Sequence, residues 1–440
     1  MLLRRRRRRP VEVVDAARWR GLCGDALLGG APGVERLLAE LRAAAQRNAA
    51  YDREAALDAL LDAPPELWLQ LDRFARRTEQ QRLELHGGDL LGLLLASLDR
   101  DGRLRQAAVE RLAGTGGPLA VSALALRTAD WVTPVRERAV AALTRRTAPD
   151  EAAAAVRLLI RLRDRHRSGG LIEAYGRVLA EPERRRAVRA LAADEDPPTR
   201  RFGVGLALEL GEYVRGDLLR TALRDPDQAC RRLCAQRLLE LDPEQAGRLL
   251  GSRSAVVREL AVAALPDDVP AARLVGPLAD RARIVRAQAR WRLYSRGEPP
   301  VDVYRKQLAK CGPSTPARLA AGLATGLGEC GEASDVALLR RLTAPVPPVA
   351  WPPLVRRSAV HAIGRLVRPA DRVTVLAPLA LDPDPGVARE VFEALLPVAG
   401  SVPLETIWLG RAHSESSVRR AADRLLRAAK SAGHERPDTA

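Results

Sequence analysis

At 440 residues, the chain is long enough for two or three ordinary domains, or for one elongated repeat array with a shared core. Apolar residues make up 47% of it but aromatic residues only 3%, so the core must be built from Ala, Leu and Val, which suits packed helices and argues against a β-sandwich. The net charge of +17 invites a nucleic-acid-binding interpretation, yet only three residues are Lys, and the Arg and Ala usage is typical of the coding bias of a GC-rich genome.

The chain begins with a run of arginines, Arg4–Arg9, followed by Pro10. No uninterrupted apolar stretch of signal-peptide length follows, because Glu12 and Asp15 intervene, and no later segment reaches the length of a membrane span. We therefore expect a soluble, cytoplasmic protein. The Arg run could contact nucleic acid or an anionic membrane surface; an unstructured basic tail without a fixed partner is the alternative.

Residues 1–95 are predicted to form a divergent N-terminal helical cap behind this basic tail. A cap of this kind hides the end of a repeat core from water. Trp19 and Trp68 are expected to anchor it by packing rather than to contact a ligand. Helices are expected over Val34–Ala49, Tyr51–Leu61 and Pro65–Arg77.

Residues 96–430 repeat one pattern with a period of about 30 residues, which indicates a repeat array. Each copy has an Asp, then five residues later an apolar residue followed by Arg, then Ala and Ala-Leu at helical spacing. The clearest copy contains Asp130, Val135, Arg136, Ala139 and Leu143. Room remains for a degenerate copy near Arg167–Tyr175, and the apolar start recurs at Leu104, Val135, Thr199, Cys230, Val257, Val285, Ala317, Val355, Val387 and Val418.

When the apolar start is numbered 0, positions 0, 4, 7 and 8 fall on one side of a helix and form an apolar stripe. The Asp falls in the turn before this helix, where its carboxylate can accept backbone N–H bonds. Arg follows the start in nine of the ten copies, so we expect a ladder of Asp–Arg pairs between adjacent repeats that accounts for much of the charge. The turn Asp is present in six copies, as Asp99, Asp130, Asp194, Asp225, Asp280 and Asp382.

The five Cys residues are odd in number and lack zinc-ligand spacing, which favours a reducing compartment. Cys230 and Cys234 occupy positions 0 and 4 of their copy. We interpret them as small core residues rather than as a redox or metal site.

Two segments interrupt the array, Ser295–Pro300 and Ala344–Pro353, and the second carries five Pro around Trp351. Insertions in repeat arrays project from one face and can contact partners. A rigid irregular connection is the alternative, and we favour it. Residues 431–440 are polar and aperiodic, and we predict a disordered tail.

The Asp-Pro turn, the Val-Arg start and the Ala/Ala-Leu stripe resemble short HEAT-like repeats, of the kind also found in phycobilin-lyase-type arrays, and we expect a bacterial source. The resemblance covers residues 96–430 in ten or eleven copies. It implies an all-α fold, an α-α superhelix of antiparallel helix pairs in which the second helix of each pair lines the concave face. It also implies a non-catalytic scaffold that binds other macromolecules.

Two enzyme classes have a fold similar to HEAT-like repeats, and the residues of this chain fit neither well. Deoxyhypusine-hydroxylase-like proteins bind iron through repeated His-Glu pairs, whereas this chain has one, His434–Glu435, in the tail. HEAT-like DNA glycosylases for alkylated bases combine a cationic cleft with aromatic residues and a catalytic Asp. Trp131, Trp291 and Trp351 fit superficially, but Trp131 is better interpreted as a packing residue and Trp291 has Arg neighbours on both sides. We predict no catalytic residue, cofactor or metal.

Positions 2, 6 and 9 point away from the apolar stripe and define a candidate partner-binding ridge. Its centre is apolar and aromatic and its C-terminal end is basic, which is the composition of a macromolecular interface. We expect a protein partner with an amphipathic helix and acidic flanks. Nucleic acid bound by the Arg-rich surface, with Arg201 and Arg232 added, is the alternative. The candidates are Trp291, Tyr294, Leu319, Leu323, Arg357, Arg389, Arg420 and Arg424.

Overall fold

The computed structural model describes residues 14–46, 51–76, 89–164, 169–312, 314–345 and 350–432. Over these residues the regular structure is helical, with one isolated bridge between Val14 and Tyr51 and no strand, so the predicted all-α fold is confirmed. The chain divides into two compact units, Met1–Val214 and Arg215–Ala440. The predicted boundary between the cap (1–95) and the array (96–430) lies inside the first unit and stays a prediction. The Arg4–Arg9 run, His434 and most of the predicted tail lie outside the described residues.

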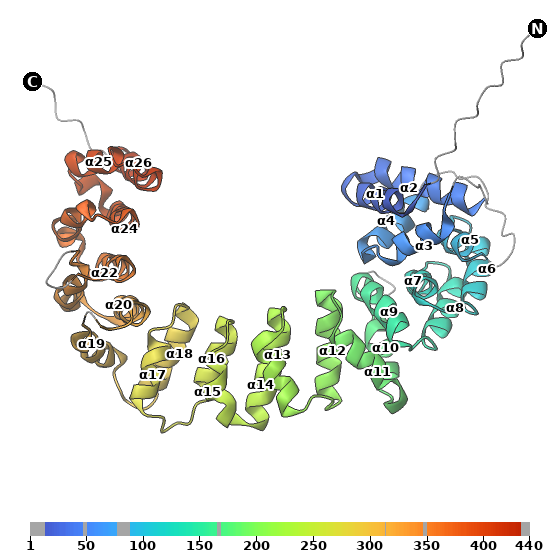
Figure 1. Cartoon of the computed structure of the whole chain (residues 1–440), viewed down its shortest axis with the longest axis horizontal. Coiled ribbons are helices and arrows are strands. Elements are labelled where there is room, and N and C mark those ends of the chain that lie inside the picture. Colours follow the sequence, from blue (N-terminus) through green and yellow to red (C-terminus); the bar gives the residue numbers. More distant parts are fainter. Residues whose placement is uncertain are drawn as a thin grey trace, which may run out of the picture. The chain divides into compact units, whose positions relative to one another are not determined.

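The first unit contains twelve α-helices and one short 3-10 helix among its described residues (Figure 1). They are α1 (Ala16–Leu28), α2 (Gly30–Ala45), α3 (Arg53–Leu61), α4 (Pro65–Ala75), α5 (Leu90–Ser97), α6 (Gly102–Leu112), α7 (Pro118–Arg127), α8 (Thr133–Leu143), α9 (Pro149–Leu162), α10 (Leu171–Leu179), η1 (Pro182–Arg184), α11 (Arg185–Ala192) and α12 (Pro197–Glu209).

The second unit is also built of consecutive helices, and 3-10 turns occur among them more often than in the first unit. Its helices are α13 (Arg215–Arg224), α14 (Gln228–Leu241), η2 (Pro243–Gln245), α15 (Ala246–Leu249), α16 (Ala255–Ala263), α17 (Ala271–Leu278), α18 (Arg283–Tyr294), α19 (Pro300–Lys310), α20 (Ala317–Cys330), η3 (Ala333–Asp335), α21 (Val336–Arg340), η4 (Arg341–Thr343), α22 (Pro353–Leu366), η5 (Pro369–Asp371), α23 (Arg372–Leu376), η6 (Ala377–Leu381), α24 (Pro385–Leu395), η7 (Leu396–Ser401), α25 (Leu404–Arg411) and α26 (Ser416–Ser431).

From α5 onward, the helices pack as consecutive pairs, and each predicted start lies at the beginning of the second helix of a pair. The degenerate copy is α10, which pairs with α9 and buries Tyr175. The predicted stripe is buried where the pattern is clearest: Val135, Ala139, Ala142 and Leu143 are all less than 9% exposed. In the second unit, α20, α22 and α24 lie along one side of the row of pairs and α19 lies on the other (Figure 1).

In all six copies predicted to carry a turn Asp, this Asp holds the turn before the second helix. In each, the carboxylate accepts the backbone N–H of the residue two positions on, at 2.7–2.9 Å. In four copies that next residue is a second Asp, which caps the N-terminus of the following helix and satisfies its unpaired backbone N–H groups: Asp101, Asp196, Asp227 and Asp384.

The predicted Asp–Arg ladder is confirmed between three pairs of adjacent repeats. The Arg at position 1 binds the turn Asp of the next copy at 2.9 Å for Arg105–Asp130, 2.7 Å for Arg258–Asp280 and 2.8 Å for Arg356–Asp382. The same guanidiniums also donate to backbone carbonyls in the turn of their own copy. The pairs are almost fully buried, so this part of the positive charge is structural.

The register of α20 differs from the prediction by three residues. The predicted start, Ala317, is half-exposed, whereas the buried stripe runs through Ala320, Ala324, Leu327 and Gly328. Moving the start to Ala320 makes the intervals to Val285 and Val355 equal. The Ala-rich sequence of this helix satisfies either register, and the choice is made by packing, because a side chain at Gly328 would collide with Ala362 of α22.

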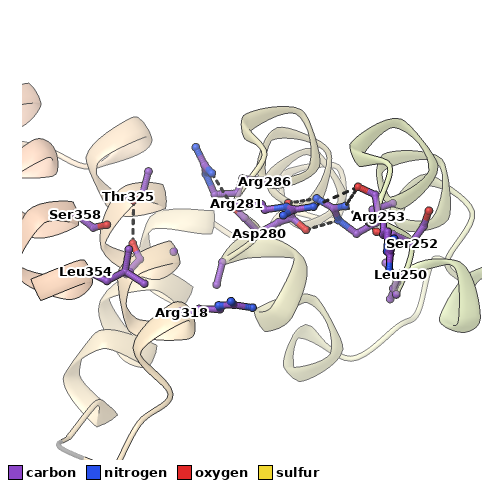
Figure 2. Close-up of a pocket in the computed structure, with 15 residues that line it drawn as sticks. Leu250, Ser252, Arg253, Asp280, Arg281, Arg286, Arg318, Thr325, Leu354 and Ser358 are labelled. Atoms are coloured by element: carbon purple, nitrogen blue, oxygen red, sulfur yellow. Dashed lines mark hydrogen bonds and ion pairs between the residues drawn. The ribbon is translucent and has the colours of Figure 1, made fainter. Parts of the chain in front are cut away.

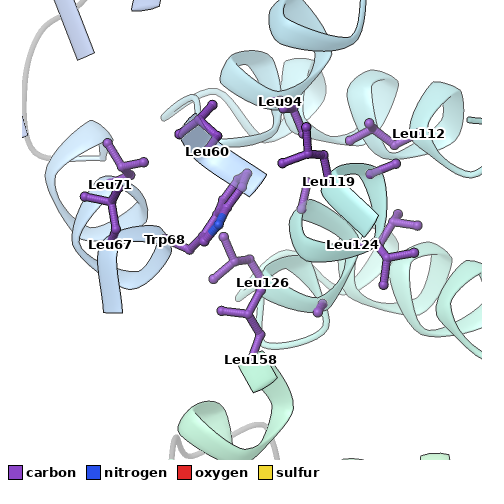
Figure 3. Packing of buried hydrophobic residues seen from close by; sticks show 14 of the residues in the cluster. Leu60, Leu67, Trp68, Leu71, Leu94, Leu112, Leu119, Leu124, Leu126 and Leu158 are labelled. Carbon is purple, nitrogen blue, oxygen red and sulfur yellow. The ribbon is translucent and has the colours of Figure 1, made fainter. Parts of the chain in front are cut away.

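The N-terminal helices form a core with the first repeats. Trp19 is fully buried and its indole N–H donates to the Asp52 carbonyl at 3.0 Å. Trp68 of α4 lies among leucines that include Leu60 of α3 and Leu126 of α7 (Figure 3). Both tryptophans therefore pack as predicted. α1, which carries Trp19, was not among the predicted helices.

In its described part, the second predicted interruption is an irregular connection whose Trp351 packs into the core. Trp351 is 5% exposed, its backbone N–H donates to the Ala344 carbonyl at 3.0 Å, and its own carbonyl accepts from Arg356. Trp351 is therefore a packing residue and is not available to a ligand.

Cys230 and Cys234 are fully buried and unpaired on α14, which confirms that they are core residues. Burial raises the pKa of each thiol to about 12, so little thiolate forms near neutral pH. We expect neither to react with iodoacetamide at pH 8 in the folded protein, as measured by peptide mass spectrometry. The same reaction in denaturant should label both, and labelling of the folded protein at a similar rate would contradict their burial.

Candidate partner-binding surface

Trp291 and Tyr294 form a stacked aromatic pair on the exposed face of α18. Val285, Ala289 and Leu293 bury the other face of this helix. Trp291 is 59% and Tyr294 69% exposed, and their rings stack with centroids 6.4 Å apart. Large aromatic side chains exposed together leave apolar area that a partner can remove from water, and such residues dominate the affinity of protein interfaces.

Two arginines beside Trp291 fix α18 to its neighbours. Arg292 donates to the carbonyls of Leu265 and Pro266, after α16, and pairs with Asp267 at 2.9 Å. Arg290 pairs with Glu329 of α20 at 2.6 Å. The aromatic pair is thus carried by a helix anchored on both sides, which limits the ordering cost of binding.

The structure does not place Leu319 and Leu323 on this surface. Leu323 is 1% exposed, and Leu319 is half-buried against the core of the second unit. The prediction of Leu323 as a contact residue was wrong because of the register of α20: with the start at Ala320, Leu323 faces inward. The apolar centre of the ridge is therefore smaller than predicted and consists of Trp291 and Tyr294.

The predicted basic end of the ridge is partly neutralised. Arg357 pairs with Glu390 of α24 at 3.3 Å, and His361 lies 2.9 Å from the same carboxylate. Arg424 pairs with Glu393. Arg389 is half-buried and its Nε lacks a hydrogen-bond partner. Arg420 is exposed and makes no ion pair within the described residues.

Glu390 and Glu329 are the acidic residues that sequence reasoning missed at this surface. Each lies on the second helix of its pair and binds arginines on the second helix of the preceding pair. Glu329 binds both Arg286 and Arg290. Burial alone would raise the pKa of Glu329, but hydrogen bonds from the two guanidiniums outweigh it and hold the pKa below its usual value. When the repeat start is moved to Ala320, Glu329 falls at position 9 of this copy, which is one of the ridge positions. The correct register would therefore have predicted Glu329 at this surface.

Because its folded-state pKa is lowered, Glu329 should stabilise the second unit at neutral pH and lose this effect as pH falls below about 4. We expect Glu329→Gln to unfold more easily than the parent at pH 7 and to show a smaller further loss between about pH 5 and pH 3. Thermal unfolding at several pH values measures this. Glu405→Gln, at an exposed carboxylate of the same unit that makes no ion pair within the described residues, is the control, and an unchanged pH profile in Glu329→Gln would contradict the assignment.

Trp131 is not the packing residue that was predicted. It is 56% exposed, and the guanidiniums of Arg76 and Arg105 lie over its ring, 5.4 and 5.5 Å from the ring centroid. It follows Asp130, which binds both of these arginines, so its position is a consequence of the ladder.

Within the described ranges, no group of three His, Cys, Asp or Glu side chains could hold a metal ion. No helix in these ranges is both long enough and apolar enough to cross a membrane.

The described residues form an array of helix pairs, the architecture that the resemblance to HEAT-like repeats implied. No family model matches the chain, and no curated protein matches it. Among solved structures it is similar to importin beta (14% identity, TM-score 0.39, covering 94% of this chain and 59% of that one) and to Kap121p (11%, 0.38, 94% and 53%). An engineered protein is matched at 18% identity and TM-score 0.26, covering 86% of this chain and 96% of that one. This chain thus spans little more than half of the importin beta and Kap121p chains, and the fold assignment rests on the helix pairs themselves.

Proposed function

We propose that this protein is a non-catalytic scaffold that binds a protein partner on the face formed by its second helices, with Trp291 and Tyr294 at the centre of the contact. The observation that carries the proposal is the stacked, exposed aromatic pair on an anchored helix. If the resemblance to HEAT-like repeats holds, this is the face that it implies to be concave. We place the protein in the cytoplasm, a reducing compartment that suits five unpaired cysteines.

The distribution of charge favours a protein over a nucleic acid as partner. Arg357 and Arg424, two arginines of the nucleic-acid alternative, are paired with carboxylates of the neighbouring repeat. A phosphate would have to compete with Glu390 and Glu393 for them, and these carboxylates would repel it. The glycosylase alternative is likewise disfavoured, since Glu329 near Trp291 is committed to two guanidiniums.

Site-specific photocrosslinking in cells tests the proposal. Photoreactive benzoylphenylalanine replaces Tyr294 in one strain. In a second strain it replaces Leu409, an exposed residue of α25, which is the first helix of its pair. We expect a defined crosslinked protein from position 294 that survives nuclease treatment and is absent from position 409. Crosslinks from position 294 that disappear with nuclease, or that match those from position 409, would overturn the proposal.

A further inference from the structure

A cavity of about 770 Å³ lies in the second unit beside the turns that precede α16 and α18, with α20 and α22 as its other walls. Figure 2 shows Arg318 reaching from α20 toward the turns that carry Arg253 and Arg281. The volume of the cavity is in the range of sites that accept small ligands or a few side chains. None of the sequence patterns pointed to it.

The Asp–Arg ladder is absent where the repeat of α18 meets that of α20, beside the cavity. The turn before α20 has no Asp, so Arg286 cannot pair with the next turn as Arg258 does with Asp280. Arg286 binds Glu329, farther along α20, instead. α20 then contacts the preceding repeat where Gly322 meets the backbone of Ala279, a contact that any side chain at Gly322 would prevent.

The cavity is strongly basic. Five arginines and one aspartate line it, and Asp280 is already paired with Arg258. The remaining exposed arginines, Arg253, Arg281 and Arg318, come from three successive repeats, and none makes an ion pair with a carboxylate in the part of the chain that the structure describes. Three unpaired guanidiniums around one cavity repel each other and favour an anionic ligand.

We propose that this cavity binds an acidic segment of a protein partner, whose carboxylates pair with Arg253, Arg281 and Arg318. Aliphatic surface is also present: Leu354 is 48% exposed and lines the cavity with Leu250, so an apolar side chain next to the acidic residues would be accommodated. Mixed apolar and acidic chemistry fits a peptide better than a phosphate backbone. The inference rests on the proposed protein-binding function and adds the chemistry of the partner.

The test measures binding of a fluorescein-labelled decapeptide that repeats Glu-Glu-Leu to the full chain by fluorescence anisotropy. The variant combines Arg253→Gln, Arg281→Gln and Arg318→Gln. Its control carries the same charge change at three exposed arginines that do not line the cavity, Arg340→Gln, Arg341→Gln and Arg427→Gln. We expect the cavity variant to bind at least about tenfold more weakly and the control to stay within about twofold of the parent.

Three outcomes would overturn the inference: no peptide binding by the parent, equal losses in both variants, or tighter binding of a single-stranded DNA decamer that depends on the same three arginines. Arg318→Glu provides a second check, since it should weaken the acidic peptide and gain affinity for a Lys-Lys-Leu decapeptide. If the partner captured at position 294 is lost by Trp291→Ser but kept by the cavity variant, the cavity assignment fails while the proposed function stands.

Discussion

Replacing Asp130 by Asn is expected to lower the free energy of unfolding of the first unit by about 3 to 5 kcal/mol. The Asp130 side chain is fully buried and binds Arg105 through two hydrogen bonds of 2.9 Å, with Arg127 at 3.1 Å and Arg76 at 3.5 Å. Burial alone would raise its pKa, but these guanidiniums outweigh it and hold the pKa below its usual value. Asn keeps the volume and removes the charge.

The loss is large because two partners stay buried after the substitution. Arg105 and Arg127 are both 0% exposed. Arg127 keeps its ion pair with Asp72, but Arg105 is left without a carboxylate partner in the described residues, and an uncompensated buried charge is far more costly than an exposed one. Asp225 provides the matched control: it holds the equivalent turn through the Asp227 N–H and makes no ion pair within the described residues. Since an Asn oxygen can accept the same bond, Asp225→Asn should cost less than about 1 kcal/mol.

Calorimetry measures both variants, and hydrogen exchange assigns each loss to α6–α8 or to α14. Two compact units need not unfold together, so the assignment to a unit matters. Equal stability of Asp130→Asn and Asp225→Asn would show that the buried cluster around Asp130 does not hold the first repeats together.

Gly203→Ala and Gly205→Ala should change stability in opposite directions although they lie two residues apart on α12. A methyl group at Gly203 would fall on the backbone of Leu191 and Ala192 of α11, whereas one at Gly205 would meet nothing within 4 Å. Gly203→Ala forces the two helices apart, at a cost of about 1 to 3 kcal/mol. Gly205→Ala keeps the fold and gains up to about 1 kcal/mol of helix propensity.

Thermal unfolding of the two variants in parallel tests this packing. Because both substitutions are chemically identical, helix propensity alone predicts the same stabilisation for each. A stabilised Gly203→Ala would mean that α11 and α12 do not approach as closely as the structure shows.

The repeat pattern predicts most of the architecture because each of its positions fits one structural role, either in a turn or on a buried helix face. An Asp that accepts the N–H two residues on, followed by an apolar-Arg step and an Ala-Leu stripe, specifies a turn and a buried helix face in each copy. The Asp–Arg ladder follows from the same spacing. Helix α1 and the division at Val214 were not predicted, since the repeat pattern bears on neither of them.

The site was harder to predict because it depends on where the pattern fails. In α20, alanines, glycines and leucines fit two registers, so sequence alone could not decide whether Leu323 faces the core or the solvent. Acidic partners on adjacent repeats, such as Glu390, are separated by about 30 residues from the arginines they bind, and helical spacing within one copy does not reveal them. The stacked pair of Trp291 and Tyr294 was predictable, since both lie opposite the buried stripe of α18.

The most direct test of the partner-binding surface is the affinity of the protein crosslinked at position 294 for Trp291→Ser and for Trp408→Ser. The two tryptophans are similarly exposed, at 59% and 54%, but Trp408 lies on a first helix, beside Arg411. We predict that Trp291→Ser weakens binding about thirtyfold or more, as expected for an interface anchor, and that Trp408→Ser leaves it unchanged. Unchanged affinity in Trp291→Ser, or an equal loss in both variants, would contradict the proposed surface.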